Sequence, residues 1–161
     1  MYNVGDKILY PMHGAGIIED VESQKVLGET KQYYITRIPN TGMKVMIPAD
    51  SCDLIGIRYI ISRKEGLKVL DFFRNEPITA DDNWNRRHRD NMVKLKSGNI
   101  YQVTEVVKNL MYRDKTKGLS TSERKTLGVA KQIVVSELVL SGTAGKDDIE
   151  SIMNDAIDEL I

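Results

Sequence analysis

The chain has 161 residues, of which 41% are hydrophobic and 29% are charged, and its 23 Lys/Arg balance 23 Asp/Glu. A chain of this size can bury a core as one or two small domains without metals or disulfides. The single cysteine, Cys52, excludes an internal disulfide, and no apolar run approaches the ~20 residues that a membrane-spanning helix needs. Residues 1–10 also lack the features of a secretory signal, so we expect a reducing, cytoplasmic location and no membrane association.

Short runs of β-type residues alternate with turns over the first fifty residues. The strand candidates are residues 6–10, 14–23, 31–38 and 43–48, and the segments between them are rich in Gly, Pro and Asn. These connections are too short for the crossovers of a parallel sheet. The sequence therefore predicts a small twisted antiparallel sheet or open barrel.

Helical signals dominate the remainder of the chain. Two capping boxes, Ser62 with Glu65 and Ser120 with Glu123, predict helices over about 62–75 and 120–141. A helix from about residue 79 to 97 is expected between them, with Asp81 and Asp82 in its first turn, followed by a helix over about 99–117 and an amphipathic helix at the chain end. The apolar spacing predicts these core residues: Ile100, Val103, Val107, Leu110, Met111, Leu127, Ala130, Val134, Leu138, Ile149, Ile152, Met153, Ala156, Ile157 and Leu160. The expected fold class is α+β.

The neutral total hides an uneven distribution of charge. Residues 84–117 carry nine Lys/Arg and three Asp/Glu, a local charge of +6, whereas residues 137–161 carry one lysine and seven acidic residues, a local charge of −6. A basic segment usually forms a solvated helix face, and it indicates nucleic-acid binding only when an aromatic residue lies within it.

Catalytic and metal-binding patterns do not emerge. The segment 13–19 has Glu19 where a dinucleotide fingerprint needs its third glycine, and Leu140 stands where a phosphate loop beginning before Lys146 needs a glycine. His13 and His88 with one cysteine provide no spacing for a structural zinc site. We therefore expect a protein that is not an enzyme and that needs no cofactor or metal.

The segment 81–90, with the sequence DDNWNRRHRD, contains the only tryptophan. Trp84, His88, Met92 and Leu95 fall on one side of the predicted helix. A lone tryptophan at such a position is more often a partly buried core residue than a contact for nucleic acid. The amides and cations around Trp84 weaken that preference, and both interpretations stay open on the residues alone.

Three blocks, in one order along the chain, carry a family resemblance. They are VGDKILYPMHGAGIIE at 4–19, VMIPAD at 45–50, and NWNRRHRDNMVKLKSGN at 83–99, which leads into VVKNL and RDKTKGLSTSERK. This pattern resembles the CarD/CdnL family of bacterial transcription regulators over essentially the whole chain. The first block also occurs in the polymerase-interacting module of transcription-repair coupling factor, whereas the tryptophan block does not.

The resemblance implies a Tudor-like β-domain at residues 1–56 that docks on the β subunit of bacterial RNA polymerase. It implies a compact helical domain at residues 57–161 that touches promoter DNA. Such regulators are not enzymes; they stabilise the open complex by contacting duplex DNA at the upstream edge of the melted region. We expect this protein to act as a monomer, located at the nucleoid through the polymerase.

The resemblance also assigns roles to residues of the helical domain. Trp84 corresponds to the family's wedge in the DNA minor groove, a role that suits a planar apolar side chain. Phosphate contacts are expected from Arg86, Arg87 and Arg89, although these three cannot share one helix face and one of them can be structural. Arg124 matches a basic family position at the start of the fourth helix and is expected to add a phosphate contact.

The polymerase contact is expected on the strand 43–48, because an unpaired edge strand can extend a partner's sheet. The residues expected to take part are Lys25, Arg37, Lys44, Val45, Met46, Ile47 and Pro48. Met46 and Gln24 stand where the family often has basic residues, which puts those two charged contacts in doubt. Without the resemblance, 43–48 would be an ordinary strand with one solvated face. The alternative function is a docking module without DNA contact, similar to that of transcription-repair coupling factor.

Overall fold

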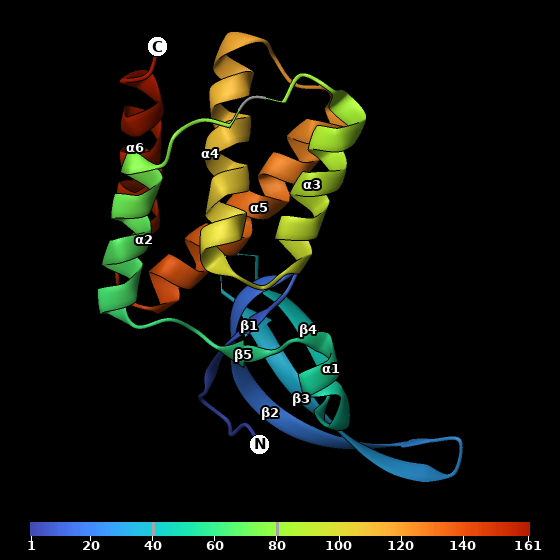
Figure 1. The fold of residues 1–161 in the computed structure, drawn as a ribbon. Coiled ribbons are helices and arrows are strands. Elements are labelled where there is room, and N and C mark those ends of the chain that lie inside the picture. The colour runs from blue at the N-terminus through green and yellow to red at the C-terminus, as the bar shows by residue number, and fades with distance from the viewer. Residues whose placement is uncertain (40, 80) are drawn as a thin grey trace.

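The computed structural model describes residues 1–39, 41–79 and 81–161. The N-terminal part holds the strands β1 (Lys7–Tyr10), β2 (Gly14–Val26), β3 (Glu29–Ile38), β4 (Met43–Pro48) and β5 (Arg58–Tyr59), with a 3-10 turn (Ala49–Ser51) and the short helix α1 (Cys52–Ile55) before β5. Five longer helices follow: α2 (Arg63–Asn75), α3 (Trp84–Lys96), α4 (Ile100–Thr116), α5 (Thr121–Leu140) and α6 (Lys146–Asp158). The predicted α+β fold is confirmed, with the sheet and the helices forming two distinct layers of the molecule (Figure 1).

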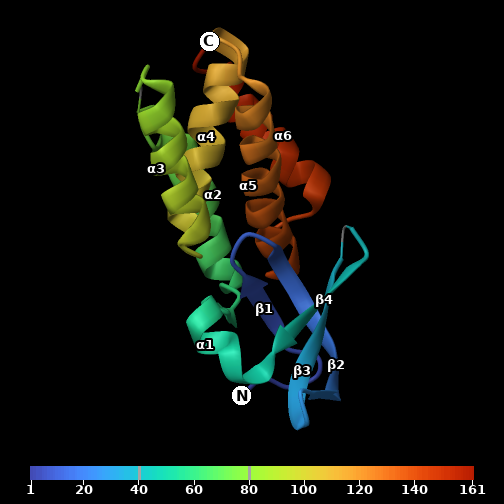
Figure 2. The same ribbon diagram turned by 90° about the vertical axis from the view of Figure 1, so that its right-hand side faces the viewer.

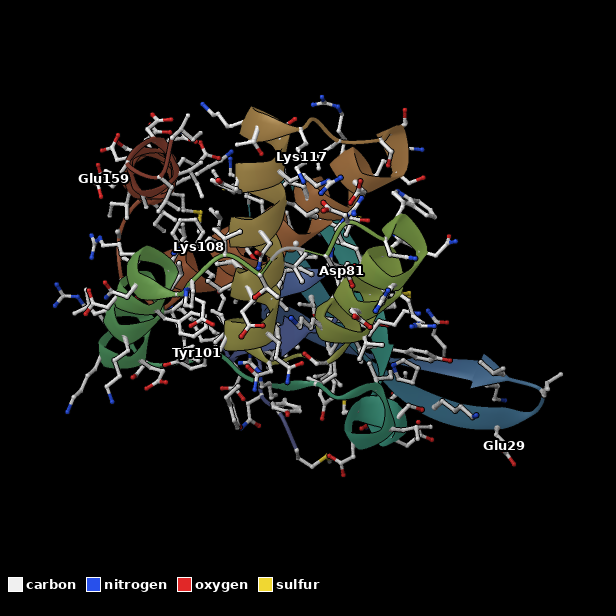
Figure 3. All side chains as sticks on the ribbon, turned by 45° about the horizontal axis from the view of Figure 1, so that its top comes forward. Glu29, Asp81, Tyr101, Lys108, Lys117 and Glu159 are labelled. Carbon is white, nitrogen blue, oxygen red and sulfur yellow. The ribbon has the colours of Figure 1, made fainter. Side chains whose placement is uncertain are left out.

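The five strands form one antiparallel sheet in the order β4-β3-β2-β1-β5. The turn between β2 and β3 needs only Leu27 and Gly28, both at positive φ, as a type I′ hairpin turn requires. Both strands therefore extend beyond the predicted ranges as a two-stranded ribbon. Its tip, marked by Glu29, points away from the helices (Figure 3).

The two faces of the sheet bury different cores. Ile8, Ile18 and Ile47 pack with Tyr34 and Cys52 in a small core of the β-domain. The adjacent residues point the other way, as alternation along a strand dictates, and Leu9 and Ala15 join the larger core of the helices. Figure 2 shows α5 descending onto the sheet where β1 ends and β2 begins. The sheet and the helices thus share a buried boundary.

The helical core follows the predicted pattern closely. All predicted core positions are buried or half-buried except Leu160, which lies after the last turn of α6 and is exposed. Tyr101 and Lys108 of α4 both reach α2, where the Tyr101 hydroxyl donates to Glu65 and the Lys108 ammonium donates to the backbone oxygens of Arg74 and Glu76 (Figure 3). Lys108 therefore satisfies the C-terminal carbonyls of α2 from inside the domain.

The start of α3 differs from the prediction. The helix begins at Trp84 rather than near residue 79, so Asp81 and Asp82 lie before it and not in its first turn. Asn83 is the N-cap, since its side chain accepts a hydrogen bond from the Arg86 amide at 2.9 Å. The Asp81 carboxylate accepts from the Asn83 amide, and the Asp82 carboxylate pairs with Lys117 at 2.7 Å. These two acids hold the segment before the helix instead of stabilising its dipole.

Each capping box forms the hydrogen bond to the serine hydroxyl, while its glutamate carboxylate binds elsewhere. Ser62 and Ser120 accept hydrogen bonds from the amides of Glu65 and Glu123, as predicted. Both glutamate carboxylates bind other side chains: Glu65 accepts from Tyr101, and Glu123 pairs with Arg87. A carboxylate near an N-cap is free to form a stronger tertiary contact when a partner comes close.

The chain after residue 56 still contributes to the sheet. Arg58 and Tyr59 form β5, which pairs with β1, so the sheet runs past the predicted division between 1–56 and 57–161. Neither β5 nor α1 was predicted, because two and four residues are too short to show a period. The two-domain division itself stays a prediction.

Within the described ranges, none of the helices has the length and apolar character needed to cross a membrane. No cluster of three or more metal-ligating side chains occurs among those same residues.

Candidate nucleic-acid interface and docking edge

Trp84 occupies the first position of α3 with a large exposed surface. Its relative accessibility is 41%, although the residues that follow it on the same side of α3 become steadily more buried and end with Leu95 in the core. The indole thus lies at the exposed end of one face of α3, and the other end of that face, at Leu95, packs into the core. This placement makes Trp84 accessible to a partner while its helix is anchored.

Two contacts fix the orientation of the indole. The His88 ring stacks on it one turn later, with centroids 5.1 Å apart and planes inclined by 4°. The indole Nε1 donates to the Ser120 hydroxyl at 3.3 Å, and the same hydroxyl caps α5. Aromatic pairs contribute about 0.5–1.5 kcal/mol beyond their buried area. The largest exposed side chain on α3 is therefore held in one direction before any partner arrives.

Arg87 lies on the inner side of this site. Its guanidinium makes two hydrogen bonds to Glu123, at 2.7 and 3.0 Å, and a third to the Asp81 backbone oxygen at 2.8 Å. The side chains of Arg87 and Glu123 are only 11% and 3% exposed. Hydrogen bonding to Glu123 raises the pKa of Arg87, and hydrogen bonding from Arg87 lowers the pKa of Glu123 although burial acts in the opposite direction. Arg87 thus joins α3 to α5 and the segment before α3.

The other predicted arginines are exposed but point in different directions. At about 100° per residue, Arg86 and Arg89 lie roughly 160° and 140° around the helix axis from Trp84. Both therefore project from faces turned well away from the indole. Arg86 pairs with Asp81 at 3.2 Å. Arg124 extends from the first turn of α5, one turn after Ser120, and pairs with Asp114 at 3.2 Å. Arg124 thus lies on the helix whose N-cap, Ser120, holds the indole.

Among the described residues, the strand β4 lies at one edge of the sheet, as predicted, and pairs with β3 alone. Met46 is exposed and Val45 and Pro48 are half-buried, so the side chains of this edge strand remain partly accessible. Ile47 is fully buried in the β-domain core. Its side chain cannot meet a partner, although its backbone remains part of the edge strand.

The predicted cations of the docking edge lie in two places. Arg37 and Lys44 are cross-strand neighbours, and both pair with Glu19, at 2.5 and 3.4 Å. The hydrogen bond from Arg37 lowers the pKa of Glu19. Lys25 lies near the tip of the ribbon, opposite Thr30, where β4 no longer accompanies β3. A partner that covers β4 would meet Lys44 and Met46 first.

Three neighbours of the candidate site residues were not identified from the sequence. Ser120 and Glu123 were interpreted as a capping box and His88 as one member of a helix face, yet these residues hold Trp84 and Arg87. The spacing of His88 four residues after Trp84 was a usable signal, because i and i+4 side chains meet on a helix. The contacts to α5 carried no signal, since they join residues 36 positions apart.

Comparisons with known proteins cover nearly all of the chain. The family model described as "CarD, C-terminal domain" matches residues 68–154, and that described as "CarD-like/TRCF RID domain" matches residues 2–61. The candidate transcription factor YdeB of Bacillus subtilis (strain 168) is 37% identical over 147 residues, which make up 91% of this chain and 96% of YdeB. The solution NMR structure of the 72-residue N-terminal domain of Myxococcus xanthus CarD is 27% identical, covers 37% of this chain and 79% of its own, and has a TM-score of 0.33. On the two family models and the match to YdeB, this chain belongs to the CarD family of transcription factors.

Proposed function

We propose that the protein docks on the β subunit of bacterial RNA polymerase and stabilises the promoter open complex by minor-groove contact at the upstream edge of the bubble. The exposed and pre-oriented Trp84 carries this proposal. A flat apolar group held rigidly can press on a base step without first losing rotamer freedom. The family resemblance of the N-terminal part supports docking through the β4 edge.

Four arginines divide between two roles in this proposal. Arg86, Arg89 and Arg124 are exposed and contact phosphates, whereas Arg87 positions α3 against α5 through Glu123. Each lost phosphate contact should reduce the slope of log affinity against log salt by about one. Substituting Arg86, Arg89 or Arg124 by alanine should each show this change.

The docking edge combines backbone and side chains. The free edge of β4 can add to a sheet of the polymerase β subunit without any particular side chain. Lys44 and Met46 border that edge, and Arg37 lies on the neighbouring strand, so they would contact the rim of the interface, with Lys25 reaching a more distant point. A few phosphate contacts and one wedge form a small DNA footprint, and docking would raise the effective concentration of the wedge.

The decisive experiment measures the lifetime of open complexes formed by bacterial RNA polymerase, with and without the protein. We expect the wild-type protein to lengthen the lifetime and Trp84→Ala to abolish the effect while polymerase binding persists. Val93→Ala is the matched control, because Val93 is an exposed apolar residue on the same helix. If Trp84→Ala retains the full effect, the docking-only alternative is correct. No lengthening by the wild-type protein would sink the proposal.

A further inference from the structure

An ion pair between a half-buried arginine and a buried glutamate connects the sheet to α5. Arg58 of β5 makes two hydrogen bonds to Glu137 of α5, at 2.6 and 2.9 Å, and its Nε donates to the Gly98 backbone oxygen at 2.9 Å. The Glu137 side chain is completely buried. One arginine of the sheet therefore contacts α5 and the connection between α3 and α4 at the same time.

Glu137 gathers a further partner from the segment that leaves the sheet. Its carboxylate accepts a hydrogen bond from the Ile61 amide at 2.9 Å, so it binds both β5 and the chain that leads into α2. A buried carboxylate is stable only when it is paired and hydrogen-bonded in this way. Loss of either member of the pair would leave an uncompensated charge at the boundary between sheet and helices.

The first residues of β2 contact the same part of α5. The Ala15 amide donates to the buried Ser136 hydroxyl at 2.9 Å. Gly14 has φ near +104°, and a Cβ there would lie only 2.8 Å from both the Gln132 Oε1 and the Ser136 Oγ atoms. The backbone of β2 thus approaches α5 more closely than any residue with a side chain would allow.

The opposite end of α5 holds the exposed tryptophan. Ser120 accepts the indole Nε1 hydrogen bond, and Glu123 binds Arg87 of α3. A helix of 20 residues is about 30 Å long, and α5 is continuous from Thr121 to Leu140. The sheet and Trp84 are therefore attached to the two ends of one helix, as the paths of α3 and α5 in Figures 1 and 2 illustrate.

We propose that Arg58 and Glu137 are positioning residues that fix Trp84 at a set distance and direction from the docking edge β4. Resting on the function proposed above, this assignment explains how a docked protein reaches one place on the promoter. An arginine fork bound to a buried carboxylate permits only one arrangement, so it specifies geometry more than it adds stability. When the pair is broken, the sheet still docks and the indole still stacks on His88, but the two surfaces no longer keep one separation.

The first test measures that separation in the free protein. Spin labels at Met43→Cys in β4 and Val93→Cys in α3, both exposed positions, in a Cys52→Ser background report the distance distribution. We expect a single narrow distribution for the otherwise wild-type protein and a broader or shifted one for Glu137→Gln. The milder Arg58→Lys serves if Glu137→Gln does not fold. Asp71→Asn, which breaks an exposed arginine-carboxylate pair in α2, is the matched control and should leave the distribution unchanged.

The second test uses unlabelled variants and the open-complex lifetime. Arg58→Lys should lose at least half of the lengthening that the wild-type protein gives, while its polymerase affinity and Trp84 fluorescence stay as in wild type. An unchanged distance distribution in both variants overturns the positioning role, and so does a broadened distribution with an undiminished lifetime effect. If the wild-type protein fails to lengthen the lifetime, the proposed function falls, and the distance measurement alone decides whether the pair positions the two surfaces.

Discussion

The proposed wedge region around Trp84 and the proposed docking edge at β4 differ in which atoms would form the contact. At the wedge, one side chain is exposed and its neighbours are tied by hydrogen bonds and a buried ion pair. At the edge, the strand backbone is the common element, and Arg37 and Lys44 pair with Glu19 in a half-exposed cluster. A contact made by one side chain requires neighbours that fix the orientation of that side chain. A contact made by the strand backbone tolerates changes of side chain. Substitutions should therefore have larger effects at the wedge than at the edge.

The largest effect is expected from Glu123→Gln at the wedge. This change leaves Arg87 buried without its charge partner, and breaking a buried pair in this way costs about 3–5 kcal/mol. Urea unfolding at neutral pH measures the free energy of unfolding. Asp71→Asn, which breaks an exposed pair, should cost less than about 1 kcal/mol. Equal losses in the two variants would contradict the assignment of Arg87 to a structural role.

A smaller effect is expected from Ser120→Ala, which removes the cap of α5 and the acceptor for the indole. The loss of a cap costs about 1 kcal/mol. Because Trp84 is the only tryptophan, its emission reports directly on the site, and acrylamide should quench it more strongly in this variant. Ser62→Ala removes the equivalent cap of α2 and is the control: it should lower stability by a similar amount and leave the emission unchanged.

The same contrast explains what the sequence could predict. The strands, the core stripes and the edge position of β4 depend on residues close together in the chain, so period and turn chemistry reveal them. The predicted start of α3 was wrong because Asp81 and Asp82, two acids before an apolar residue, suggest the first turn of a helix. In the structure, the Asn83 side chain caps the helix, which begins at Trp84. Nothing local distinguishes these possibilities, since Asp82 is held by Lys117, the C-cap of α4.

The contact between Trp84 and Ser120 and the Arg58–Glu137 pair could not be predicted from the sequence, for a related reason. Their members are separated by 36 and 79 positions, and each residue taken alone resembles an ordinary cap or surface charge. Charge counts showed that the tryptophan lies in a basic segment, yet they could not tell that Arg87 is buried and that Arg124 pairs with Asp114. Burial of a charge becomes visible only when its partner's position is known.

A modest effect is expected from Met46→Arg at the docking edge. An added cation at the rim of an interface changes affinity by less than about 1 kcal/mol and does so mainly through the association rate. We expect up to a few-fold tighter binding to the polymerase β subunit at low salt, disappearing as salt rises. Met43→Arg places the same charge on the other face of β4 and is the control. Equal gains from both variants would show that Met46 does not border the partner.

The smallest effect is expected from Glu19→Gln, and its pH dependence sharpens the comparison. Both Glu19 and Glu123 have a pKa lowered by an arginine, so each contributes stability that is present above the ordinary glutamate pKa, about 4.3, and is lost as the pH falls through the lowered value. The Glu19 pair is about one third exposed and is screened by solvent and salt, whereas the Glu123 pair is buried. The free energy of unfolding should therefore be measured from neutral to acid pH. Its slope against pH should become much smaller in Glu123→Gln and should hardly change in Glu19→Gln. A slope that falls equally in both variants would mean that the exposed edge is held as firmly as the wedge.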